Sequence, residues 1–77
     1  MERYKNSGGK SNVVAYEIGP DFVSICFADG GKYIYTNQSA GLANIEKMKQ
    51  LALTGQGVNS FINRVVSNRY ESKGRCY

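Results

Sequence analysis

Residues 22–36 read FVSICFADGGKYIYT and consist of two strand-forming runs on either side of a turn. Both runs are rich in β-branched and aromatic side chains, which fit a pleated sheet. Asp29-Gly30-Gly31 separates the runs, and glycine tolerates the positive φ that tight hairpin turns require. This stretch therefore predicts a β-hairpin.

The hairpin extends toward the N-terminus. Residues 12–18 are also strand formers, and Gly19-Pro20-Asp21 predicts the connecting turn. Together the runs predict a three-stranded antiparallel meander. One alternating set of its side chains is apolar or aromatic throughout and is expected to face the core: Val14, Tyr16, Ile18, Val23, Ile25, Phe27, Tyr33 and Tyr35. This choice requires a hairpin loop with an odd number of residues, because a two-residue loop would turn both tyrosines of 33–35 to the solvent face.

Two amphipathic helices are predicted after the sheet. The first has its apolar stripe at Leu42, Ile45, Met48 and Ala52, and the second at Val58, Phe61, Ile62 and Val65, running to about residue 68. Gly55 is expected to cap the first helix, and Val65-Val66 is also compatible with a strand. Since both stripes must be buried, the predicted fold is α+β, with a three-stranded antiparallel meander followed by two helices packed on one face of the sheet. Phe27 and Phe61 are expected in the core.

A chain of 77 residues is long enough for one core only. Residues 1–10 and 71–77 are polar, so we expect a flexible N-terminal arm and a flexible C-terminal tail around a domain of residues 11–70. The net charge is +4, and its basic excess lies in residues 1–10 and 55–77. Such a distribution permits contact with nucleic acid, because charge decides partners more than it decides the fold.

The compartment is expected to be the cytoplasm. No apolar run approaches the length of a membrane span, and residues 1–10 contain no apolar segment typical of a secretory signal. Cys26 lies in a predicted strand and Cys76 in the predicted tail, so we expect them to be unpaired and the protein to be a monomer.

Three stretches of the chain resemble the KTSC domain, a short module found at the C-terminus of some lysyl-tRNA synthetases and as small stand-alone bacterial proteins. They are Ser11-Asn12-Val13 leading to Tyr16, then Phe27-x-x-Gly30-x-x-Tyr33-x-Tyr35, then Phe61-Ile62-Asn63-x-x-Val66-x-x-x-Tyr70. The chain departs from the family after the second stretch, where Thr36-Asn37-Gln38-Ser39 stands in place of a Val-Pro, and this leaves the start of the first helix open. Tyr33, Tyr35, Asn63 and Tyr70 are the residues that match the family pattern.

The resemblance implies binding of RNA, because the family is attached to tRNA synthetases; this is an association and not a mechanism. Catalysis is not expected, since the chain has no histidine and no nucleophile with a base close to it in sequence. No spacing typical of metal ligands is present, so neither a metal nor another cofactor is expected.

Four cations near the C-terminus are the candidate nucleic-acid contacts: Arg64, Arg69, Lys73 and Arg75. They form either a strip that contacts phosphates or an ordinary solvated helix end. Tyr33 and Tyr35 either stack on bases or pack in the core, and their apolar neighbours favour the core. The leading hypothesis is a small RNA-binding module; the alternative is a protein-interaction module whose partner covers Phe22, Ile34 and an exposed sheet edge.

Overall fold

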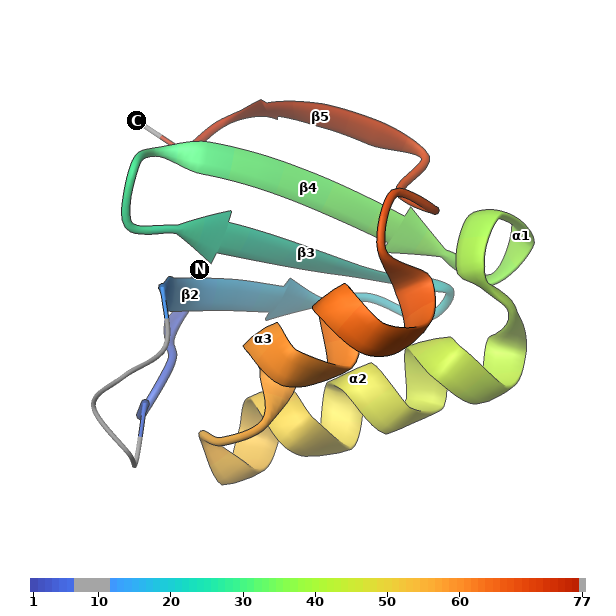
Figure 1. Cartoon of the computed structure of the whole chain (residues 1–77), viewed down its shortest axis with the longest axis horizontal. Coiled ribbons are helices and arrows are strands. Elements are labelled where there is room, and N and C mark those ends of the chain that lie inside the picture. The colour runs from blue at the N-terminus through green and yellow to red at the C-terminus, as the bar shows by residue number, and fades with distance from the viewer. Residues whose placement is uncertain (7–11, 77) are drawn as a thin grey trace.

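The computed structural model describes residues 1–6 and 12–76 and shows one antiparallel sheet with helices against one of its faces (Figure 1). The elements follow along the chain as β1 (Glu2–Arg3), β2 (Val13–Ile18), β3 (Phe22–Phe27), β4 (Gly31–Thr36), α1 (Asn37–Ala40), α2 (Leu42–Thr54), α3 (Val58–Phe61), the π-helix η1 (Ile62–Val66) and β5 (Ser72–Arg75). The strands lie side by side in the order β1-β2-β3-β4-β5. The predicted α+β class and meander are confirmed, but the sheet has five strands instead of three.

The two additional strands come from the segments predicted to be a flexible arm and a flexible tail. In β1, Glu2 lies opposite Tyr16 of β2, and in β5, Lys73 lies opposite Tyr33 of β4. The edges of a sheet present unpaired N–H and C=O groups, which any polar segment can satisfy with its own backbone. The polar composition of these two segments therefore predicted flexibility, although the backbone of each pairs with the sheet. Residues 7–10 of the predicted arm, and Ser11, lie outside the described residues.

The β3–β4 hairpin has the odd loop that the core pattern required. The loop spans residues 28–30, and Gly30 has a φ of 91°. Tyr33 lies opposite Ile25, so Tyr33 and Tyr35 share the helix-covered face with the apolar residues of β3, as predicted.

The core face of β2 differs from the predicted one. Val14 and Ile18 are exposed, whereas Val13 is completely buried together with Tyr16. The pairing with β3 shifts register between Val13 and Ala15. A bulge of this kind adds one residue to one strand, so the side chains before it exchange faces. Strict alternation consequently placed Tyr16 correctly and Val14 on the wrong side. Ile18 lies after the bulge, opposite Val23, and is exposed at the last position of the strand.

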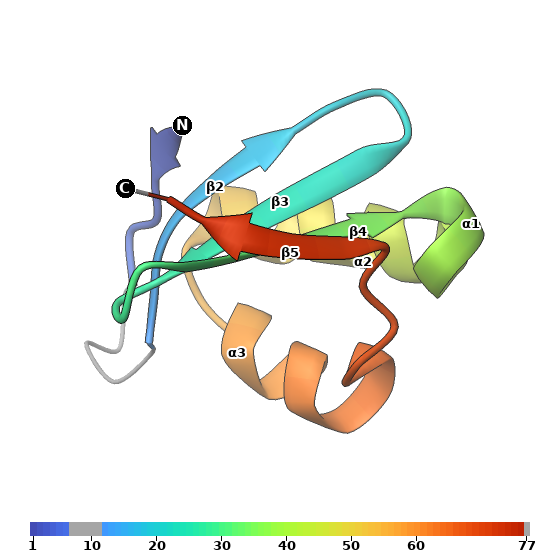
Figure 2. The same ribbon diagram turned by 90° about the horizontal axis from the view of Figure 1, so that it is seen from above.

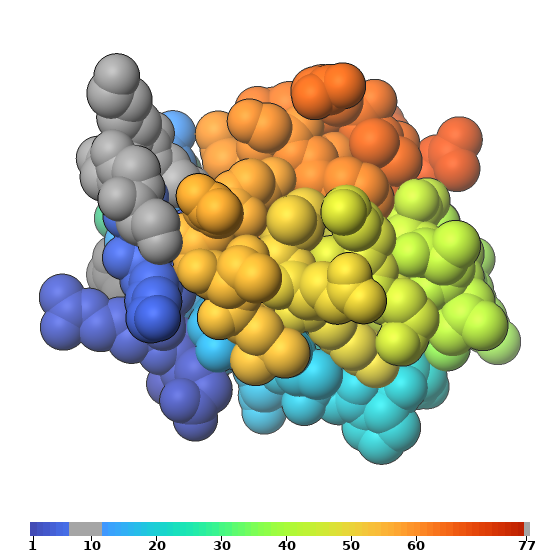
Figure 3. Space-filling view, turned by 90° about the horizontal axis from the view of Figure 1, so that it is seen from below, coloured from blue at the N-terminus to red at the C-terminus, as the bar shows by residue number. Residues whose placement is uncertain are grey.

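Helices α2 and α3 lie next to each other under the sheet, and the space-filling view shows the surface that they form (Figure 3). Ile45, Met48 and Ala52 of α2 are buried as predicted, whereas Leu42 at its first position is exposed. The helix ends at Gly55, whose φ of 84° is the left-handed cap that the sequence predicted. None of the helices in the described ranges is long and apolar enough to cross a membrane.

The short helix α1 begins where the chain departs from the family pattern. The Thr36 hydroxyl accepts a hydrogen bond from the Ser39 N–H at 3.0 Å, and the Ser39 hydroxyl accepts one from the Thr36 N–H at 3.0 Å. This reciprocal capping box satisfies two N–H groups at the helix start. The chain therefore starts its helical segment with hydroxyl side chains in place of proline.

The second predicted helix is α3 continued by the π-helix η1. Val58, Ile62 and Val66 are buried, whereas Val65 is exposed and Phe61 only partly buried. A π-helix has more residues per turn than an α-helix, so the buried position moves from residue 65 to Val66.

Aliphatic residues and three tyrosines, Tyr4, Tyr16 and Tyr35, build the core, whereas the phenylalanines lie at its border. Phe27 and Phe61 pack against the core but remain partly exposed, contrary to their predicted central place. The largest completely buried side chains are Tyr35, Ile25, Ile45, Met48, Val13, Val23, Val58 and Val66. They connect the middle of the sheet with both helical segments.

Cys26 and Cys76 form a disulfide, so the expectation of unpaired cysteines is wrong. Their Cα atoms are 6.0 Å apart, a usual separation for a disulfide. β5 returns along β4, and the Cys76 N–H donates to the Gly30 carbonyl at 2.8 Å. The pairing was not predicted because β5, which brings Cys76 to Cys26, lies in the segment that was predicted to be a flexible tail.

Candidate functional site

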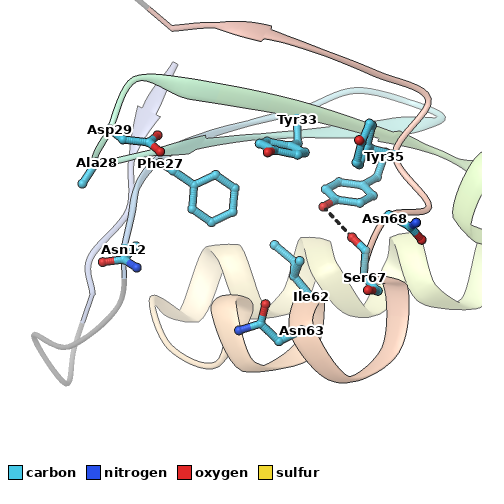
Figure 4. A pocket seen from close by; sticks show the side chains of 11 residues that line it. Asn12, Phe27, Ala28, Asp29, Tyr33, Tyr35, Ile62, Asn63, Ser67 and Asn68 are labelled. Carbon is cyan, nitrogen blue, oxygen red and sulfur yellow. Dashed lines mark hydrogen bonds between the residues drawn. The ribbon is translucent and has the colours of Figure 1, made fainter.

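An open pocket of about 610 Å³ lies between the β3–β4 hairpin and η1 (Figure 4). It is lined by Asn12, Phe27, Ala28, Asp29, Tyr33, Tyr35, Ile62, Asn63, Ser67, Asn68 and Tyr70. The volume is within the range of pockets that hold small molecules or a nucleobase. Two elements far apart in sequence therefore build one site with an aromatic side and an amide-rich side.

The aromatic side consists of rings in edge-to-face contact. The centroids of Tyr33 and Tyr70 are 4.8 Å apart with an interplanar angle of 87°, and those of Phe27 and Tyr33 are 5.5 Å apart at 84°. Such pairs hold ring orientations because the positive edge of one ring meets the negative face of the other. Tyr33 and Tyr70 are only half-buried, so part of each ring remains accessible from the pocket.

Tyr35 forms the floor of the aromatic side. Its side chain is 1% exposed, and its hydroxyl donates to the Ser67 carbonyl at 3.5 Å (Figure 4). Burial, followed by the neighbouring Tyr33 and Tyr70, raises the pKa of Tyr35 to about 12. The phenol is therefore neutral at physiological pH. Its ring contacts the ring of Tyr70 edge-to-face and adds no charge to the pocket.

The segment after η1 has an unusual backbone that directs side chains into the pocket. Ser67 has φ 44° and ψ −109°, a conformation that non-glycine residues rarely adopt. It follows directly on the π-helix, and both features are found preferentially at functional sites. Beyond this turn the chain presents Asn68 and Tyr70 to the pocket. The sequence held no signal for this turn, since serine is not a residue that predicts positive φ.

The polar side of the pocket offers both donors and acceptors. Asn12, Asn63 and Asn68 each contribute a side-chain amide, which has two N–H donors and one carbonyl acceptor. The Asp29 carboxylate uses one oxygen to accept the Gly31 N–H at 2.8 Å, which fixes the hairpin loop at the pocket's edge. All three amides are exposed enough to exchange water for a ligand.

Two of the predicted cations lie beside the pocket on β5. Lys73 is opposite Tyr33, and Arg75 is opposite Gly31. Facing residues of antiparallel strands have their side chains on the same face of the sheet. Lys73 and Arg75 therefore belong to the face that Tyr33 presents to the pocket. Both side chains are exposed and ready to contact an anion.

The other two cations belong to the segment that forms the opposite wall. Arg64 follows the lining residue Asn63 in η1, and Arg69 stands between the lining residues Asn68 and Tyr70. Both are exposed. The four predicted cations thus come from three places, namely η1, the turn after it and the edge strand β5. Their contact with phosphate stays a prediction.

The four residues of the family pattern, Tyr33, Tyr35, Asn63 and Tyr70, all line this pocket. The sequence correctly placed Tyr33 and Tyr35 on the helix-covered face, but it gave no sign that this face stays open at one end. Asn12 and Asp29 were noted only for the family pattern and the hairpin turn, and Ser67 and Asn68 not at all, so none of these four lining residues was predicted as part of a site. Among the described residues, no group of three or more His, Cys, Asp or Glu is placed to hold a metal ion.

No protein-family model matches the chain, and comparisons with curated proteins and with solved structures likewise give no match. The resemblance to the KTSC domain accordingly rests on the motif residues alone.

Proposed function

We propose that this chain is a small, non-catalytic, monomeric module that binds single-stranded nucleic acid, with RNA as the favoured ligand. One observation carries the proposal: the half-buried Tyr33, in an open pocket, shares a sheet face with Lys73 and Arg75. The resemblance to a module appended to tRNA synthetases supports RNA over DNA by association.

An unpaired base fits the aromatic side of the pocket. Proteins that recognise single-stranded RNA stack splayed bases on aromatic rings and bond the base edges with polar side chains. Tyr33 and Tyr70 offer accessible ring surface, and Asn63 and Asn68 also line the pocket with their amides. The ligand is thus held by stacking on the rings and by hydrogen bonds to the amides.

The backbone of the same nucleotide strand runs past the cations. Lys73 and Arg75 flank the pocket on β5, and Arg69 belongs to the turn that carries Tyr70. Each phosphate that a cation neutralises releases condensed counterions, so affinity falls as salt rises. Stacking and charge therefore make separable contributions to the affinity.

The test is fluorescence anisotropy with a short labelled single-stranded oligoribonucleotide across a salt series. Tyr70→Leu keeps an apolar side chain but removes the ring, and should weaken binding about tenfold at every salt concentration, as expected for one lost stacking contact. Lys73→Ala and Arg75→Ala should each flatten the logarithmic salt slope by about one unit per lost phosphate contact.

Lys47→Ala is the matched control, because Lys47 is an exposed cation on α2. It should leave both affinity and salt slope almost unchanged. If Lys47→Ala weakens binding as much as Lys73→Ala does, the positive charge attracts RNA without a site. Unchanged affinity in Tyr70→Leu would exclude the pocket as the place where a base binds.

A protein partner is the second candidate, favoured by one hollow on the other side of β4. Phe22, Ile34 and Asn37 line it, and the Asn37 Oδ1 atom is buried with no hydrogen-bond partner within the described part of the chain. A protein partner that covered Phe22 and Ile34 and donated a hydrogen bond to Asn37 Oδ1 would give this oxygen the bond that it lacks. Ile34→Gln separates the candidates, since it removes the apolar contact without adding charge and should weaken such a partner while leaving RNA affinity unchanged.

A further inference from the structure

The edge strand β5 buries none of its side chains. Ser72, Lys73, Gly74 and Arg75 are all exposed, so no apolar packing holds the strand on the sheet. It is attached by its ladder with β4 and by two flanking backbone bonds, from the Glu71 N–H to the Ile34 carbonyl at 2.7 Å and from the Cys76 N–H to the Gly30 carbonyl at 2.8 Å. Short exposed ladders of this kind open at small free-energy cost.

The disulfide is the covalent attachment at the far end of this strand. Cys26 is 2% exposed in the central strand β3, and Cys76 directly follows β5. Figure 2, which looks onto this edge of the sheet, shows β5 in front, alongside β4, and running to the end of the chain. The bond therefore ties an otherwise weakly held strand to the most buried strand of the sheet.

The same strand carries the cations and follows the third tyrosine of the pocket. Tyr70 is two residues before β5, and its ring contacts Tyr33 at 4.8 Å and Tyr35 at 6.3 Å between centroids. Lys73 and Arg75 are in the strand itself. Whatever loosens β5 removes two cations from the pocket's edge and frees the segment that positions Tyr70.

We propose that the Cys26–Cys76 disulfide is a redox switch for this pocket: the oxidised chain holds β5 in place and binds, and the reduced chain releases β5 and binds weakly. The proposal rests on the proposed function for the identity of the ligand. In a reducing compartment such as the cytoplasm, which the sequence predicts, persistent disulfides are rare and those that occur are mostly catalytic or redox-sensing.

The switching step is thiol–disulfide exchange with a dithiol reductant. A thiolate of the reductant attacks the sulfur of Cys76, the more accessible of the two, and Cys26 leaves as a thiolate that takes up a proton. The second thiol of the reductant then attacks the mixed disulfide and releases Cys76. Two electrons and two protons pass to the protein, and the reductant ends as its own disulfide.

The experiment combines hydrogen exchange with RNA binding on the full chain, before and after treatment with dithiothreitol. Reduction should remove the protection of the Glu71 and Cys76 amides, which bond across the β4–β5 edge. The Tyr4 amide, which donates to the Val14 carbonyl at 2.9 Å at the other edge, should stay protected and show that the domain remains folded. Affinity for the labelled oligoribonucleotide should fall about tenfold, the effect of one lost stacking contact.

Cys76→Ser is the matched variant, and it should behave like the reduced protein in both buffers. Unchanged protection of the Glu71 and Cys76 amides after reduction would overturn the switch. The switch would also be overturned if β5 is released in the reduced protein and the reduced protein still binds the oligoribonucleotide as tightly as the oxidised protein does. If β5 is released as expected but the oxidised protein does not bind the oligoribonucleotide, the proposed function is wrong and the release of the strand stands.

Discussion

The two outer strands of the sheet, β1 and β5, are attached by different forces. β1 is only two residues long, but Tyr4 directly after it is 3% exposed in the core, and its hydroxyl accepts the Val58 N–H at 3.4 Å. β5 is twice as long but has no buried side chain, and a disulfide closes its far end. One edge is anchored by a buried ring and the other by a covalent bond.

In both cases a short polar segment joins the sheet because a contact beyond the backbone hydrogen bonds holds it. Backbone pairing alone is worth little at an edge, because water satisfies the same groups in the unfolded chain. The contact that a buried tyrosine makes is weakened by heat and denaturant like the rest of the core, whereas a disulfide is broken by reducing agents. The two edges should therefore respond to different treatments.

The largest effect is expected at the β1 edge. Tyr4→Ala removes a buried aromatic side chain and should lower the free energy of unfolding by about 3–5 kcal/mol, enough to unfold much of a small domain. Urea denaturation monitored by circular dichroism measures the change. Tyr4→Phe keeps the ring and loses one hydrogen bond, so it should cost only about 1 kcal/mol. If Tyr4→Ala is as stable as the parent protein, β1 is held by its backbone alone.

The β5 edge should show an intermediate effect that depends on reductant. The disulfide joins positions 50 residues apart. Opening it should cost about 2–4 kcal/mol of stability, mainly because the unfolded chain regains the conformations that the cross-link excluded. Parallel denaturation curves of the parent and of Cys76→Ser, with and without dithiothreitol, measure this. A stability of the parent protein that does not respond to dithiothreitol would contradict the role of the bond.

The smallest effect at neutral pH is expected in the floor of the pocket. The hydrogen bond of Tyr35 to Ser67 is long, at 3.5 Å, so Tyr35→Phe should change stability by less than about 1 kcal/mol. Its signature lies at alkaline pH. The pKa of Tyr35 is raised from 10.0 to about 12 in the folded chain, so above pH 10 the unfolded chain loses this proton first, and stability falls as pH rises toward 12.

Tyr35→Phe should remove that part of the alkaline slope, as measured by urea midpoints at several pH values between 10 and 12. The disulfide and the lysines are the same in both proteins, so the difference between the two curves isolates Tyr35. Identical slopes would mean that the buried phenol keeps its ordinary pKa.

Local patterns predicted the centre of the fold correctly. The positive φ at Gly30 and Gly55, and the buried stripe of α2 from Ile45 onward, depend on neighbouring residues only, and the structure confirms them. The errors lie where distant segments decide the outcome. The register of β2 depends on a bulge, and the buried face of η1 depends on a π-turn, neither of which has a signature in single residues.

The candidate site was predictable in its parts but not as a site. Tyr33, Tyr35, Asn63 and Tyr70 were named from the family pattern, and the structure brings them to one pocket. That convergence requires the turn at Ser67 and the strand that follows it, and a polar tail rich in cations gives no sign of either. The polar residues that line the pocket can be identified only when the positions of the β3–β4 hairpin and of η1 are known.

The π-helix η1 also has a consequence for chain length. A π-turn is equivalent to an α-helix that has accommodated one inserted residue. In η1 the buried side chains are those of Ile62 and Val66, and the turn that begins at Ser67 follows directly. A chain shorter by one residue in this stretch would regain regular α-helical geometry. The segment after the helix would then be rotated by about 100° around the helix axis, the angle that one residue spans. The segment from Asn63 to Tyr70 is therefore one in which substitutions should be tolerated more readily than deletions.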